Sequence, residues 1–174
     1  MTKFKKPSKP VFVTLLSASA LVFVLACIGV GILIANISQT ATIEQGASPN
    51  APDFQSVLPE GKKIDSLGGW QKLIAPGGET FYTFLDSLDS VPISVSQQEL
   101  PASFKDTVDS SVADVAKGYS ATDTFTVEDT KAYIGVSAKG QQSVIFTKND
   151  LLILINSQSK IEVDTWKSYI KSLD

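Results

Sequence analysis

Two serines each precede a lysine by three residues, a spacing found in hydrolases whose lysine assists a serine nucleophile. The pairs are Ser157–Lys160 and Ser168–Lys171. A chain with 21 serines and 15 lysines in 174 positions shows about two such pairs by chance. The sequence has no G-x-S-x-G turn and none of the companion motifs that such hydrolases need. We therefore assign no catalytic residue, and a small hydrolase using a Ser/Lys pair or carboxylates stays an alternative.

Carboxylates cluster at three places, and two carboxylates at the right separation can hydrolyse a glycosidic bond. None of these stretches has the alternating oxygen ligands, glycine turn and closing glutamate of a calcium loop. Solvated surface charge is the better explanation, so we predict no metal or cofactor site. The clusters are Asp86 with Asp89, Asp106 with Asp109, and Glu128 with Asp129.

Several side chains that commonly perform chemistry are missing. The chain has no histidine and no arginine, and its one cysteine, Cys27, lies in an apolar run. Histidine is the usual acid–base group near neutral pH and the commonest zinc ligand. Arginine is the usual bidentate clamp for phosphate or carboxylate. These absences favour a binding module over an enzyme.

Six aromatic residues fall in or beside predicted strands, where core packing is their ordinary role. A groove for an apolar ligand is the alternative interpretation. They are Trp70, Phe81, Tyr82, Phe84, Tyr133 and Phe146.

Charge is distributed unevenly along the chain. Residues 1–10 carry four lysines, and all 18 acidic residues lie at or after Glu44. Beyond residue 37 there are eleven lysines against 18 acidic residues, a net charge of −7. An acidic surface repels nucleic acid, so we predict no nucleic-acid partner.

The 27 residues Val11–Ile37 contain no charge. A helix of that length spans roughly 40 Å, more than the roughly 30 Å hydrocarbon core of a bilayer. We predict a transmembrane helix there, with residues 1–10 as a cytoplasmic lysine-rich tail and the C-terminal part outside. Val24–Cys27 also resembles a lipobox, so lipidation of Cys27 stays open. Either form tethers the rest of the chain to the membrane.

Residues 38–57 are rich in Ser, Thr, Ala, Gln and Pro and predict a flexible linker. An extracytoplasmic domain is predicted over 58–174. Alternating or β-branched segments between turn residues predict its strands. These are Lys62–Leu67, Trp70–Ala75, Glu79–Leu85, Val91–Gln97, Thr124–Val127, Lys131–Ser137, Gln142–Thr147 and Leu151–Asn156. Pro92 places the first residues of its strand at a sheet edge, and the apolar run Leu151–Asn156 predicts a central strand covered on both faces.

Two helices complete the prediction. Ser103 is the expected N-cap of the first, with Gly118 at its end. Its apolar stripe is Phe104, Val108, Val112, Val115 and Tyr119. The closing helix, Val163–Leu173, should bury Trp166, Ile170 and Leu173. The fold class is therefore α+β, with an N-terminal transmembrane helix followed by one antiparallel sheet packed with two helices.

The segments Ser94–Lys105, Tyr133–Ile161 and Trp166–Leu173 resemble uncharacterised single-pass membrane proteins of Saccharibacteria-like bacteria of the candidate phyla. More distantly, the strand-then-helix ending is similar to lipoprotein-carrier and sigma-regulator sheet domains. The resemblance implies a bacterial, membrane-tethered protein and supplies no active-site residue or cofactor. We expect a tethered, non-enzymatic interaction module that binds an envelope protein or an apolar ligand.

Overall fold

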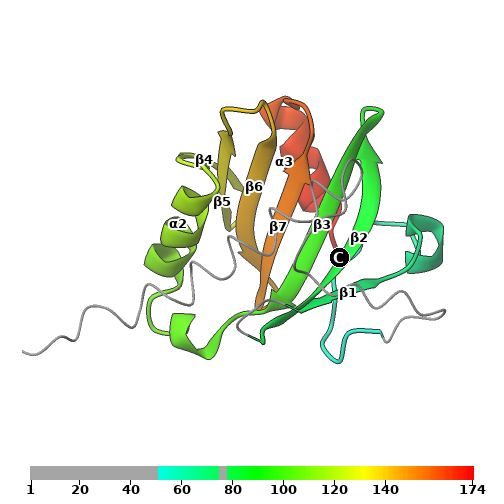
Figure 1. The fold of residues 1–174 in the computed structure, drawn as a ribbon, viewed down its shortest axis with the longest axis horizontal. Helices are drawn as coiled ribbons and strands as arrows, with labels where there is room; N and C mark the ends of the chain where they lie inside the picture. The colour runs from blue at the N-terminus through cyan, green and yellow to red at the C-terminus, as the bar shows by residue number, and fades with distance from the viewer. Residues whose placement is uncertain (1–50, 75–77) are drawn as a thin grey trace, which may run out of the picture.

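A computed structural model describes residues 51–74 and 78–174 (Figure 1). These residues form one seven-stranded sheet in the order β1-β2-β3-β7-β6-β5-β4, together with two α-helices, which confirms the predicted α+β class. The predicted transmembrane helix Val11–Ile37 lies outside the described residues. Within the described ranges, no helix is long and apolar enough to cross a bilayer.

The sheet consists of two antiparallel meanders that meet in the middle. The first contains β1 (Gln71–Ile74), β2 (Thr80–Leu88) and β3 (Val91–Glu99). The second contains β4 (Asp123–Val127), β5 (Thr130–Val136), β6 (Gln142–Lys148) and β7 (Leu151–Ser157). The last strand of each meander pairs with the other, from Ile93 opposite Ser157 to Glu99 opposite Leu151. The apolar β7 is therefore central, as its sequence predicts.

Helix α2 (Val108–Gly118) connects the two meanders and covers one face of the sheet over β5 and β6 (Figure 1). A short 3-10 turn, η2 (Ala102–Phe104), leads into it. The helix buries Val112, Val115 and Ala116 against sheet residues that include Tyr133, Ile145 and Leu154. The predicted apolar stripe is confirmed from Val108 to Tyr119, whereas Phe104 packs on the same core from η2, outside the helix.

Helix α3 (Val163–Ser172) covers the opposite face. Trp166 is completely buried there, and Ile170 and Leu173 are nearly so, which confirms the predicted stripe. The same core contains Val144 and Phe146 of the sheet. The two helices thus cover opposite faces of one sheet, and this is why β7 is apolar on both sides.

An extended segment that we call the strap, Phe54–Glu60, runs along the α3 side of the sheet. Val57 is completely buried, and the ring of Phe54 lies 5.5 Å from the ring of Tyr82. Backbone hydrogen bonds join Leu58 to Asp174 in both directions, at 2.9 and 2.8 Å. The packed domain therefore begins before residue 58, because part of the predicted linker packs on the sheet.

The structure differs from the sequence prediction at two elements. Lys62–Leu67 contains a 3-10 turn, η1 (Ile64–Leu67), instead of a strand. Ser66 explains the difference, because its backbone N–H and its hydroxyl both donate to the Lys63 carbonyl, at 2.9 and 2.6 Å. Helix α2 begins at Val108, so Ser103 is not its N-cap.

The late start of α2 also has a local cause. The Thr107 N–H donates to the Phe104 carbonyl at 2.9 Å and closes a separate turn.

The prediction that Pro92 lies at a sheet edge is confirmed for the first two residues of β3. Val91 and Pro92 pair only with β2, and the pairing of β3 with β7 starts at Ile93.

Candidate functional site

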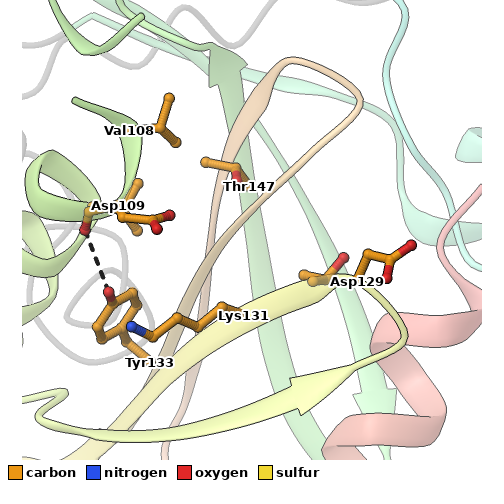
Figure 2. Close-up of a pocket in the computed structure, with 8 residues that line it drawn as sticks. Val108, Asp109, Asp129, Lys131, Tyr133 and Thr147 are labelled. Carbon is orange, nitrogen blue, oxygen red and sulfur yellow. Dashed lines mark hydrogen bonds between the residues drawn. The ribbon is translucent and has the colours of Figure 1, made fainter. Parts of the chain in front are cut away.

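A hollow of about 100 Å³ opens between the first turns of α2 and the β4–β5 hairpin (Figure 2). Tyr133 of β5 and Thr147 of β6 contribute polar groups to it, and Val108 and Val112 of α2 contribute apolar ones. Asp109, Asp129, Thr130 and Lys131 complete its lining.

Tyr133 is a buried residue in the wall of this hollow. It is 8% exposed, and its hydroxyl donates to the backbone carbonyl of Asp109 at 3.3 Å. The Lys131 ammonium lies 5.0 Å from the centre of the Tyr133 ring, within the range of a cation–π contact (Figure 2). The ammonium of Lys131 therefore lies over an aromatic face.

Two carboxylates from different predicted clusters line the same hollow. Asp109 stands on the first turn of α2, and Asp129 on the turn between β4 and β5. Among the described residues, neither carboxylate has a hydrogen bond or an ion pair within the protein. Both are therefore available to an outside partner.

Their sequence neighbours are placed elsewhere. Glu128 forms an ion pair with Lys171 of α3, with 3.3 Å between Oε1 and Nζ. Asp106 is exposed on the turn before α2. Two of the three predicted clusters are therefore not single sites, because only Asp109 and Asp129 of these four residues line the hollow.

Asp86 has a structural role at the opposite face of the sheet. Its side chain is 4% exposed and accepts from Lys62 at 2.5 Å and from the Tyr169 hydroxyl at 3.1 Å. Burial, followed by the charge of Asp86 and the hydrogen bond to it, raises the pKa of Tyr169 well above its usual value. Asp89 accepts from the Thr165 hydroxyl at 3.2 Å. This cluster joins β2 to α3.

The two serine–lysine pairs are engaged in local contacts. The Ser157 hydroxyl donates to the Ser159 carbonyl at 2.7 Å, and Lys160 lies 3.7 Å from Glu162. The Ser168 hydroxyl donates to the Asp164 carbonyl of the preceding helical turn at 3.1 Å. These contacts are typical of loop closure and of serine inside a helix.

The six aromatic residues divide between the two faces of the sheet and do not share one groove. Trp70 lies edge-on to Phe84 at 5.4 Å and to Tyr82 at 6.3 Å on the α3 side, where Phe146 is also buried. Phe81 and Tyr133 belong to the core under α2. Only Tyr133 contributes to the hollow.

Two glutamines that sequence reasoning missed hold the α3 side together. Gln97 is completely buried and makes two hydrogen bonds to the backbone of Val57, at 3.0 and 2.6 Å. Gln142 accepts from Ile161 and Trp166. The sequence did carry a signal for such residues, namely a glutamine at a strand position that faces the core. A buried amide needs hydrogen-bond partners, so a glutamine there indicates a structural contact.

The described residues contain no group of three or more Asp, Glu, His or Cys side chains that could hold a metal ion. No family model, curated protein or solved structure matches this chain.

Proposed function

We propose that this protein is a membrane-tethered, extracytoplasmic interaction module, and that a partner envelope protein docks at the hollow beside α2. The hollow carries the proposal, because it joins two carboxylates without an internal partner to a lysine and a tyrosine held in place. A partner surface with separate hydrogen-bond donors for Asp109 and Asp129 suits this lining.

The polar side chains outside the hollow that were candidates for catalysis are bonded within the fold, and this supports a binding role without catalysis. The carboxylate of Asp86 and the hydroxyl of Ser157 are already bonded within the fold. No specific observation favours the alternative of a hydrolase that uses carboxylates or a Ser/Lys pair. The tether is the predicted helix Val11–Ile37, with the lysine-rich tail in the cytoplasm.

Site-specific photocrosslinking in native membranes tests the docking surface. A photoreactive amino acid replaces Asp109 in the full-length protein, and in a matched control it replaces Asp164, which is exposed on α3 at the opposite face. We expect one discrete adduct at position 109 that is absent at position 164. The adduct should fade when Asp129→Asn is added to the crosslinking variant.

Equal labelling at positions 109 and 164 contradicts the proposal, since it shows chance collision. A discrete adduct at position 164 with none at position 109 also contradicts it, because the docking face is then the α3 side. The control is sound because Asp164 is paired only with Lys167, an exposed neighbour on the same helix.

A further inference from the structure

The strap is attached through its backbone more than through its side chains. The N–H groups of Val57, Leu58 and Glu60 donate to Gln97, Asp174 and Ser172 respectively. Of its side chains, Val57 and Pro59 are buried, while Phe54 and Leu58 are only partly buried. Helix α3, in contrast, is attached by the buried side chains of Trp166, Tyr169 and Ile170.

The surface beneath the strap contains polar groups beside its apolar core. Gln97 uses both polar ends of its amide on the backbone of Val57, and an amide is readily hydrated once such a partner leaves. Tyr82, which contacts Phe54 at 5.5 Å, likewise carries a hydroxyl. An opened strap therefore leaves groups that water can satisfy.

A hinge and a stop border the strap on its C-terminal side. Gly61 has φ +74° with open space around it, a conformation that glycine adopts without strain. The next residue, Lys62, is bonded to buried Asp86, and Leu67 and Trp70 then pack in the α3-side core. Opening can therefore proceed from the N-terminal side up to Gly61 and end there.

We propose that the strap is a latch that opens while the sheet stays folded. Short segments with few buried contacts are the parts of proteins that open below the free energy of global unfolding. Combined with the proposed membrane tether, opening has a consequence for function. Seven freed residues add at most about 24 Å of reach at roughly 3.4 Å per residue, so the latch sets how far the module stands from its anchor.

Hydrogen exchange on the full-length protein in detergent micelles tests the latch. We compare the peptide covering Phe54–Glu60 with the peptide covering β7 across a series of low urea concentrations. The strap amides should exchange at least about tenfold faster than those of β7, with little dependence on urea. Equal rates with equal urea dependence overturn the proposal, since the strap then opens only with the whole domain.

A disulfide lock supplies the second arm. Leu58 and Asp174 exchange both backbone hydrogen bonds, and residues paired in this way have Cα atoms about 5.5 Å apart, within disulfide range. In a Cys27→Ser background, oxidised Leu58→Cys/Asp174→Cys should slow strap exchange at least about tenfold, and reduction should restore it. Unchanged exchange in the oxidised protein overturns the latch.

Gln97→Leu and Gln98→Leu form a matched pair, because adjacent residues of β3 face opposite sides and only Gln97 bonds the strap. Gln97→Leu should speed strap exchange and leave β7 unchanged, whereas Gln98→Leu should leave the strap unchanged. A β7 effect as large as the strap effect in Gln97→Leu overturns the latch. These readouts involve no ligand, so failure of the docking proposal and failure of the latch are separable.

Discussion

The indole Nε1 of Trp166 donates to Oε1 of Gln142 over 2.9 Å, and the backbone N–H of Ile161 donates to the same oxygen over 2.8 Å. Gln142 is the first residue of β6 and is 2% exposed. One amide oxygen thus joins the sheet to the loop before α3 and to the helix itself. Polar bonding and apolar packing fix α3 at the same place.

Replacing Trp166 should strongly destabilise the domain. Trp166→Ala removes a completely buried side chain, a change that typically costs about 3–5 kcal/mol. That is a large part of the roughly 5–15 kcal/mol available to a domain of this size. Urea unfolding of residues 51–174 measures the effect. Lys167→Ala is the control, because Lys167 is exposed and paired with Asp164.

Unchanged stability in Trp166→Ala would show that α3 does not carry the core. Trp166→Phe separates the two contributions, since it keeps most of the packing and removes the donor to Gln142. Its cost should be about 0.5–1.5 kcal/mol, as expected for the loss of one hydrogen bond, because Ile161 still donates to the Gln142 oxygen.

We expect the free energy of unfolding to fall at alkaline pH because of Tyr169. Burial and the nearby charge of Asp86 raise its pKa, so the folded protein holds the phenol proton more tightly than the unfolded chain. A raised pKa stabilises the fold fully below the unfolded value of 10.0, and the contribution falls as pH rises above it.

Unfolding free energies measured between pH 8 and pH 11.5 should therefore decline more steeply in the native sequence than in Tyr169→Phe. Tyr133→Phe serves as the comparison, because Tyr133 bonds a neutral carbonyl at the other face of the sheet. Parallel pH curves for the native sequence and Tyr169→Phe would refute the linkage to Asp86.

Strands were predictable here because their pattern depends on local chemistry. Val91–Gln97 alternates apolar and polar side chains, and the structure extends it only to Glu99. The stripe of Trp166, Ile170 and Leu173 likewise specified the buried face of α3 before any tertiary contact was known.

The hollow was not predictable, because it depends on which distant residues meet. Asp109 and Asp129 lie on different elements, and their local sequences grouped them with Asp106 and Glu128. The strand order and the packing of α2 over β5 and β6 place both of them in the lining of one hollow. Ser103 was chosen as N-cap from spacing alone, whereas the turn closed by Thr107 delays the helix.

The topology prediction is tested with protease on intact spheroplasts. Four lysines precede the uncharged run Val11–Ile37, and the residues that follow it up to Gly61 contain no lysine, so the N-terminus should be cytoplasmic. Proteinase K should remove a C-terminal epitope and leave an N-terminal epitope protected until the membrane is permeabilised. Protection of the C-terminal epitope before permeabilisation would reverse the orientation.

Gly135 should be the least replaceable glycine of the sheet. A Cβ added there would lie 1.8 Å from the Ser120 carbonyl oxygen and 2.6 Å from Cα of Ala121, both backbone atoms. The loop that leaves α2 thus rests directly on β5, and neither side can yield without moving the helix or the strand. Ser120 itself has φ 59°, which shows how tightly the chain turns at this point.

Gly135→Ala should therefore cost about 1–3 kcal/mol or more through overpacking, measured by urea unfolding. The closest control is Gly140→Ala, where φ is +83° but nothing lies within 4 Å of the added Cβ. That variant should lose only the roughly 1 kcal/mol of an alanine forced into left-handed backbone. If both variants lose the same amount, the contact between Ser120 and Gly135 does not hold α2 on the sheet. A larger loss in Gly135→Ala, with disturbed amide signals at Asp109 and Tyr133, would show that this contact also positions the hollow.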